Sequence, residues 1–431
     1  MDAIKKPDSN ELKTAAPPEP PNERRRAFSA LQHKDFRLLL FGQSVSQIGT
    51  QMQVAAIGWQ VYQLTHDAFQ LGLIGIFRVG PLIACSLLGG SVADSVDRRR
   101  LLLVTQTILM LCAVALAFVT LSGSANVVWI YGLIAFAGAT DAFDRPTYSA
   151  LVPSLVPRSQ LANALSLNTL SFQTATIVGP GLGGVTIALL GVQGAYWINA
   201  ISYLAVIMSL LLISFRPGAG SGRKVSIALA VEGLRFVWGK KILVSTMLLD
   251  FFATFFSSAT TLLPIFAADV LHTNEVGFGL LSASEAIGAA STSLIMALVH
   301  VNRFRKPGRL LLVAVFFFAL FTILFGFSNW LPFSLFCLAM VGASDTVSMV
   351  LRQTIAQLVT PDEMRGRMQS VNMIFYAGGP QLGEVEAGIV ARVGGAPLSV
   401  VSGGIACVII IGLITLSSRQ LRDYKFETSA E

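Results

Sequence analysis

Twelve apolar stretches follow one another along this chain, the first beginning near Phe36 and the last ending near Ser417. Each is long enough to cross a lipid bilayer as a helix, which takes about 20 apolar residues. Of all residues, 53% are hydrophobic and 13% are charged. In a soluble domain, about a quarter of the residues are charged. The pattern therefore predicts an all-α polytopic membrane protein.

We expect twelve transmembrane helices in two six-helix halves. The longest internal interruption, residues 216–241, begins with a glycine-rich run and separates an N-terminal half, 36–215, from a C-terminal half, 242–417. Residues 226–238 in this central loop have the pattern of an amphipathic surface helix. Residues 1–35 are polar and proline-rich, so we expect a disordered cytosolic tail, and 418–431 form a second tail. The spans fall at residues 37–64, 68–90, 100–122, 126–148, 162–190, 194–215, 242–268, 276–300, 309–328, 331–353, 367–391 and 396–417.

The basic residues are distributed almost wholly to one side of these spans. Of 31 Lys and Arg residues, only Arg78 and Arg392 lie off that side, which leaves 31 − 2 = 29 on it. Because basic loops stay in the cytoplasm, we expect both termini there. The net charge of +7 does not indicate nucleic-acid binding, since the basic residues sit in short loops rather than on one patch.

An internal repeat supports the division into halves. A shift of 204 residues aligns Gly138-Ala139-Thr140-Asp141 with Gly342-Ala343-Ser344-Asp345, and it also pairs Gly184 with Gly388 and Gly191 with Gly395. In transporters built from two parallel six-helix repeats, the binding site lies between the two halves, and the halves rock about that site. The repeat therefore predicts a central site.

A few charged residues interrupt the apolar spans. A charge inside a bilayer is costly unless it has a partner or lies in a water-filled cavity. Arg78 lies about 15 Å deep in its span at 1.5 Å per residue. One interpretation is a polar cavity in which Arg78 binds an anionic group and one acid carries a proton; the other is a set of fixed salt bridges. The acids are Asp141, Asp250, Glu285, Asp345, Glu384 and Glu386.

The first span carries a polar stripe of Gln43, Gln47, Thr50 and Gln51. Their spacing puts these side chains on one helix face, so they line a cavity or bond to a neighbouring helix. Four phenylalanines between 251 and 256 face lipid or contact an aromatic substrate. We find no metal-ligand cluster, Walker motif or nucleophile triad, so we expect neither an enzyme nor a cofactor.

Two motifs resemble those of the major facilitator superfamily. Gly90, Asp94, Arg98 and Arg99 match four positions of its signature loop, although Ser95 and Asp97 depart from it. The resemblance implies an inner gate, for which Asp144 is a candidate partner of Arg98 or Arg99. The antiporter motif of the superfamily resembles the run Gly179-Pro180-Gly181-Leu182-Gly183-Gly184.

Residues 36–417 as a whole resemble the bacterial efflux branch of this superfamily that includes the enterobactin exporter. The resemblance implies a monomeric inner-membrane transporter that exports a small organic molecule, such as a siderophore, drug or metabolite, against proton entry. Its partners are then membrane lipids and that molecule, and its energy source is the proton gradient. A nutrient importer of the same fold and a non-transporting membrane scaffold remain alternatives.

Overall fold

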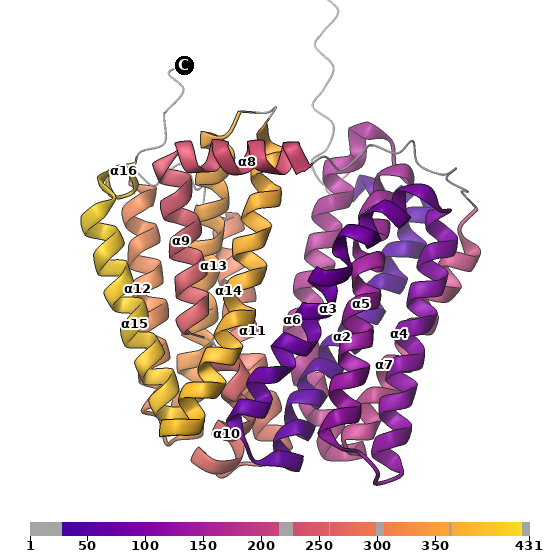
Figure 1. Ribbon diagram of the computed structural model, residues 1–431, viewed down its shortest axis with the longest axis horizontal. Helices are drawn as coiled ribbons and strands as arrows, with labels where there is room; N and C mark the ends of the chain where they lie inside the picture. Colours follow the sequence, from indigo (N-terminus) through magenta and orange to yellow (C-terminus); the bar gives the residue numbers. More distant parts are fainter. Residues whose placement is uncertain (1–27, 215–226, 258, 299–305, 362–363, 425–431) are drawn as a thin grey trace, which may run out of the picture.

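The computed structural model describes residues 28–214, 227–257, 259–298, 306–361 and 364–424, and all regular structure in them is helical. Most of these helices are long and run roughly parallel to one another (Figure 1). In chain order, the elements are η1 Ser29–Gln32, α2 Lys34–Thr65, α3 Ala68–Ser95, α4 Arg98–Leu121, α5 Val127–Leu151, η2 Val152–Ser154, η3 Arg158–Gln160, α6 Leu161–Leu190, α7 Val192–Leu212, α8 Ile227–Gly239, α9 Lys241–Phe256, η4 Ala259–Leu262, α10 Leu263–Ile265, η5 Phe266–Val270, α11 Glu275–Leu298, α12 Pro307–Gly326, α13 Leu331–Val359, α14 Arg365–Gly394, α15 Ala396–Ser417 and α16 Arg419–Arg422.

Ten helical segments in the described part of the chain are long and apolar enough to cross a membrane. The helices α2 and α14 are not among them, although they have 32 and 30 residues. Both contain many polar side chains: glutamines and serines in α2, and acids and arginines in α14. The all-helical membrane architecture is thus confirmed, while the count of twelve spans stays a prediction.

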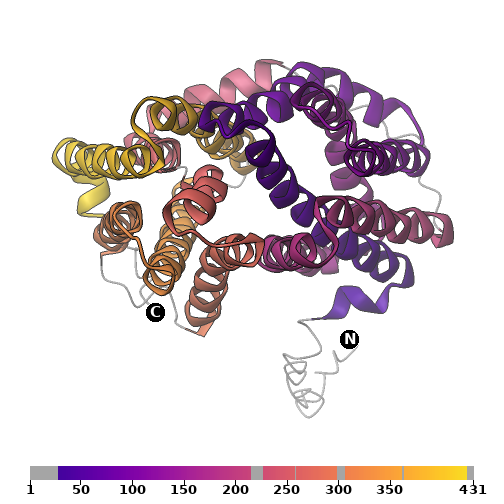
Figure 2. The same ribbon diagram turned by 90° about the horizontal axis from the view of Figure 1, so that it is seen from below.

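The helices form two groups. Helices α2 to α7 pack mainly on one another, as do α9 and α11 to α15, and Figure 2 shows the groups side by side. The amphipathic helix expected near residues 226–238 forms as α8. It crosses one face of the bundle (Figure 1). We call this face, which also carries α16 and the start of α2, the terminal face, and the other the opposite face.

Contacts between the groups cluster near the opposite face. There α3 packs on α14 and α6 on α11. Gly184 lies against Gly279, and Gly388 lies against Gly72, so closely that a Cβ on Gly184 or Gly388 would crowd the other backbone. Gly184 and Gly388, which contribute one side of each contact, are equivalent in the 204-residue repeat. Small residues let membrane helices approach in this way.

The backbone confirms another pair of the predicted repeat. Gly191 and Gly395 have φ values of 74° and 85°, and each lies at the junction between two long helices. Glycine adopts this left-handed conformation without steric cost. The same register therefore specifies the same tight connection in both groups.

Three predicted boundaries need correction. Ordered structure begins before residue 35, because Ala30 is fully buried and its N–H donates to Asn163 at 3.0 Å. Within 418–431, α16 packs its buried Leu421 against Gly308. The expected span 242–268 is broken after Phe256. Pro264 has no N–H to donate to the preceding turn, which favours an interruption there.

Candidate functional site

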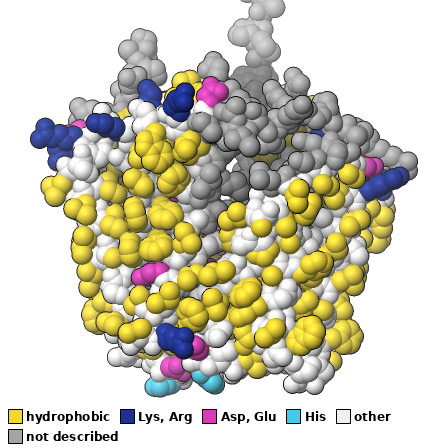
Figure 3. Space-filling model, viewed as in Figure 1, with side chains coloured by type: hydrophobic (Ala, Val, Ile, Leu, Met, Phe, Trp, Pro, Cys, Tyr) yellow, Lys and Arg dark blue, Asp and Glu magenta, His cyan; other side chains and the backbone are white. Residues whose placement is uncertain are grey.

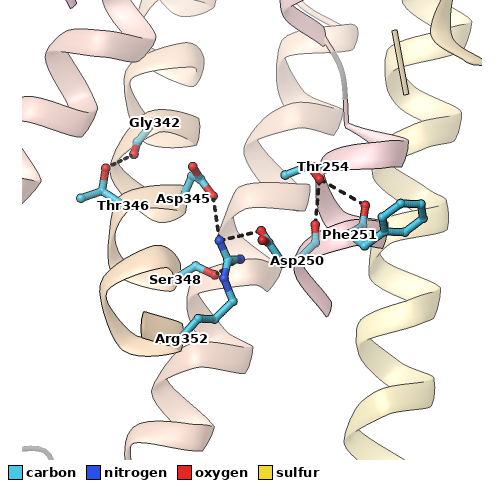
Figure 4. A network of polar contacts seen from close by, with 8 residues as sticks. All are labelled: Asp250, Phe251, Thr254, Gly342, Asp345, Thr346, Ser348 and Arg352. Atoms are coloured by element: carbon cyan, nitrogen blue, oxygen red, sulfur yellow. Dashed lines mark hydrogen bonds and ion pairs between the residues drawn. The ribbon is translucent and has the colours of Figure 1, made fainter. Parts of the chain in front are cut away.

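A buried cluster of charges joins α9 and α13 (Figure 4). The Arg352 guanidinium Nη2 lies 2.6 Å from Asp250 Oδ1 and 3.9 Å from Asp345 Oδ1. Its Nη1 donates a 2.9 Å hydrogen bond to Ser348 Oγ. Asp345, Ser348 and Arg352 share one face of α13 because they follow one another at three- and four-residue steps.

The two carboxylates of this cluster differ in environment. The Asp250 side chain is 8% exposed and Arg352 is 10% exposed, whereas the Asp345 side chain is 43% exposed. Asp345 also interacts electrostatically with Glu285 on α11. Two acids therefore share one guanidinium, and Asp345, the more exposed of the two, has the longer ion-pair distance. Because Arg352 attracts both carboxylates, protonation of either Asp250 or Asp345 changes how strongly Arg352 interacts with the other.

Arg352 is the candidate site residue that sequence reasoning missed. The predicted span ended at residue 353, which put this arginine at the membrane boundary among the basic loop residues. The helix continues to Val359, and Arg352 is buried. Its seven-residue separation from Asp345 was the available signal, because it places an arginine and an acid on one helix face.

Arg78 and Glu384 meet where the two helix groups join. The Glu384 side chain of α14 packs against Gly75 of α3, and it interacts electrostatically with Arg78, one turn further along α3. Nearby, Arg392 lies 3.9 Å from Asp67 and stacks its guanidinium over Phe69 at 5.5 Å. We call this α3–α14 contact the charged seam. The charged seam contains Arg78 and Arg392, the two basic residues that lie off the side of the spans where the other basic residues gather.

The predicted partnership of Asp144 with Arg98 or Arg99 is wrong in this conformation. Asp144 Oδ1 accepts hydrogen bonds from Thr105 at 2.6 Å and Gln106 at 3.0 Å. Arg98 donates instead to the carbonyl of Ala150 (3.2 Å) and Arg99 to that of Leu211 (2.9 Å), at the ends of α5 and α7. The carbonyls at a helix C-terminus lack partners within the helix and attract cations, which explains this choice.

Other residues of the predicted gate loop have separate roles. Asp97 stands where the superfamily signature has glycine, and its carboxylate caps α4 by accepting from the N–H groups of Arg99 and Arg100. Gly90 and Asp94 belong to α3, and their side-chain surroundings lie outside the described part. Asp141 pairs with Arg145 one turn away at 3.3 Å and lies apart from the Arg352 cluster.

The polar stripe of α2 serves partly to bond neighbouring helices. Gln51 donates to Thr176 of α6 at 3.0 Å, and the Thr50 hydroxyl lies 3.3 Å from that of Tyr203 on α7. Gln43 has a buried Oε1 without a hydrogen-bond partner among the described residues. Gln47 is half-buried. Gln43 and Gln47 therefore remain candidates for contact with a bound molecule.

The glycines of the predicted antiporter motif divide between two neighbours of α6. Gly179 and Gly183 lie against Gln51 and Met52 of α2, and Gly184 lies against Gly279 of α11. Pro180 sits between them inside the continuous helix. The motif thus packs α6 within its own group and across the junction at the same time.

The phenylalanines of α9 extend the site toward α14. The Phe251 ring contacts the rings of Phe252 and Phe255, and it meets Phe375 of α14 edge-on at 6.2 Å. Phe251 directly follows Asp250 (Figure 4). The Phe251 ring points away from Arg352, so the aromatic surface lies on another side of α9 from the charge cluster (Figure 4). No group of three His, Cys, Asp or Glu side chains within the described ranges could hold a metal ion.

Comparison with known proteins adds independent evidence. Residues 25–430 match a family described as transmembrane secretion effectors. The chain is 26% identical over 398 residues to the multidrug efflux pump Tap of Mycolicibacterium fortuitum, covering 90% of this chain and 96% of that protein. It is 25% identical over 394 residues to the enterobactin exporter EntS of Escherichia coli O1:K1, covering 91% and 94%.

Solved structures share the fold at low sequence identity. A bacterial homologue of the human lysosomal transporter Spinster, in an inward-facing, unoccupied conformation, superposes with a TM-score of 0.71 and 14% identity, covering 95% of this chain and all of that one. A POT family transporter bound to a thioalcohol-conjugated peptide gives a TM-score of 0.69 and 11% identity over 90% and 96%.

Proposed function

Because this chain belongs to the transmembrane secretion effector family of the major facilitator superfamily, we propose that it exports a small organic molecule in exchange for protons. Its relatives are efflux transporters rather than enzymes. A drug or a siderophore-like compound is the substrate class that these relatives suggest. The proposal includes twelve spans in two halves, both termini in the cytoplasm, a monomer in the bacterial inner membrane, and no cofactor.

The observation that carries proton coupling is the sharing of Arg352 between two unequal carboxylates. Asp250 forms the short ion pair, whereas Asp345 is 3.9 Å away and 43% exposed. Protonation of Asp345 would leave the guanidinium to Asp250 alone, and deprotonation would restore the competition. Asp345 is therefore the proposed proton carrier, with Glu285 as its electrostatic neighbour. Intramembrane acids facing charged partners serve as proton relays in transporters.

The substrate would bind between the halves, where the superfamily places its sites. Gln43 and Gln47 offer amide groups from one half, and the phenylalanines of α9 offer aromatic surface from the other. Arg352 supplies a positive charge on another side of α9. An amphipathic organic molecule that combines aromatic rings with an anionic or polar group fits this combination.

Alternating access would separate the halves on the opposite face. In the present conformation, the glycine contacts of α3 with α14 and of α6 with α11 close that face. We therefore interpret the structure as the inward-facing state. Opening outward requires the charged seam to part, which exposes Glu384 and Arg78. Deprotonated Asp345 belongs to the inward-facing state, in which the proton has been released.

The test uses inverted membrane vesicles from cells that express the wild type, Asp345→Asn or Arg352→Gln. Candidate drugs and catechol siderophores are added after a proton gradient is established. We expect wild-type vesicles to accumulate at least one compound and to lose protons on its addition. Both variants should lack coupled transport when uptake is normalised to the amount of each protein in the membrane. Full coupled transport by both would refute the assignment.

A further inference from the structure

A pocket of 430 Å³ lies at the terminal face of the second helix group. It is formed where four elements meet: the end of α8, the start of α9, the end of α15, and α16. Its size is within the range of small-molecule sites. The pocket uses the first turns of α9, and none of its lining residues belongs to the Arg352 cluster. Its lining includes Trp238, Lys241, Ser245, Leu416, Ser418 and Arg419.

One part of the lining is positively charged and rich in hydrogen-bond donors. Lys241 and Arg419 are exposed, and neither forms an ion pair with any described residue. The nearby acid, Asp423, already has two partners, Arg309 at 3.4 Å and Arg422 at 3.6 Å. Ser245 donates to Ser418 Oγ at 2.9 Å, which holds α9 to the start of α16. The pocket therefore offers two uncompensated positive charges on a fixed frame.

The other part of the lining is apolar and faces outward. Trp238 is 63% exposed and Leu416 is 79% exposed. Tryptophan is enriched at the membrane–water interface, and Leu416 stands on the last turn of α15. Figure 3 shows the same arrangement at larger scale, with Lys and Arg along the upper-left edge above a band of hydrophobic side chains. The pocket thus spans the level of lipid headgroups and the beginning of the acyl chains.

We propose that this pocket binds the phosphate group of an anionic phospholipid from the leaflet at the terminal face. Lys241 and Arg419 contact the phosphate oxygens, and the Arg419 guanidinium can do so with two parallel N–H groups. The hydroxyls of the pocket serve the glycerol part, while Trp238 and Leu416 lie along the acyl chains. Basic pockets between membrane helices recognise anionic headgroups in this way. The apolar rim favours a lipid over a soluble phosphate.

The test compares lipid retention by native mass spectrometry of the detergent-purified full chain. The probe is dimyristoyl phosphatidylglycerol, with dimyristoyl phosphatidylcholine and inorganic phosphate as separate arms. The test variant is Lys241→Gln/Arg419→Gln. The matched control is Lys240→Gln/Arg422→Gln, which removes the same charge from adjacent positions outside the pocket lining. Size-exclusion chromatography checks that each variant is folded.

We expect one tightly held phosphatidylglycerol on the wild type and on the control. Retention by the test variant should fall about 25-fold, since each basic residue near an anionic headgroup contributes roughly fivefold. Equal retention by the test variant would overturn the proposal, as would an equal loss in the control. Displacement of the lipid by millimolar inorganic phosphate would overturn the assignment to a lipid.

Discussion

Removing the Arg352 guanidinium is the perturbation whose effect the structure determines most fully. Arg352→Gln removes the positive charge and shortens the side chain by two atoms, so it leaves Asp250 without its counter-charge. At 2.6 Å, the pair attracts with about 6 kcal/mol if the effective dielectric constant is about 20. Asp345 at 3.9 Å adds at most about 4 kcal/mol, reduced by water because its side chain is partly exposed.

The net effect is smaller than this attraction because both charges lose hydration in the folded state. Removing one partner of a buried ion pair typically costs about 3–5 kcal/mol. We therefore expect Arg352→Gln to lower the free energy of unfolding by that amount. The double variant Asp250→Asn/Arg352→Gln should recover most of the loss, because no uncompensated charge remains. Neither variant should transport, since Asp345, the proposed proton carrier, has lost its shared cation.

The assay is reversible unfolding in mixed micelles, followed by circular dichroism, for the wild type, the single variants Arg352→Gln and Asp250→Asn, and the double variant. Arg309→Gln serves as the control, because Arg309 pairs with Asp423 on the surface and its loss should leave the unfolding midpoint unchanged. A stable Arg352→Gln single variant, or a double variant less stable than both singles, would refute the buried-pair reasoning.

Three further predictions concern the rest of the molecule. Gly72→Val should disfavour closure of the opposite face by about 1–3 kcal/mol, so cysteine-accessibility labelling should report more outward-open protein. The control is Gly80→Val, because a Cβ at Gly80 meets nothing within 4 Å, and it should leave the labelling unchanged. Asp144→Asn should keep stability and export, because both hydrogen bonds reach one oxygen of Asp144. Asp144→Ala should lower the free energy of unfolding by about 2 kcal/mol. Loss of export by Asp144→Asn at normal stability would instead indicate that the charge of Asp144 forms a latch. Arg392→Gln should lower the free energy of unfolding by less than ~1 kcal/mol, because its ion pair with Asp67 is partly exposed and such pairs contribute little. A loss above ~2 kcal/mol in the same unfolding assay would show that the charged seam is stronger than we infer.

The sequence was most informative where one physical rule dominates. Apolar length predicted the membrane helices, and the repeat predicted that Gly191 and Gly395 are equivalent, which their shared left-handed backbone confirms. Both signals can be read from the sequence itself, so they predict structure without knowledge of tertiary contacts. The polar side chains of α2 and α14 are also visible in the sequence, and they mark these two helices as carriers of candidate site residues.

The partners of individual charges could not be predicted in this way. Asp144 was expected to meet Arg98 or Arg99, but helix-end carbonyls lie nearer to both arginines. The charged seam joins residues about 300 positions apart, such as Arg78 and Glu384, and only the packing of α3 on α14 brings them together. Arg352 was missed because the helix extends one and a half turns past the end of its apolar run.

Proton-coupled export through the Arg352 cluster is the central claim, and its most direct measurement is the stoichiometric movement of protons and substrate in proteoliposomes that contain only this protein. With a compound identified in the vesicle assay, we predict that a substrate gradient alone drives protons in the opposite direction in wild-type protein. Asp345→Asn should exchange the compound across the membrane without moving protons. Equal proton movement in Asp345→Asn and the wild type would contradict the account.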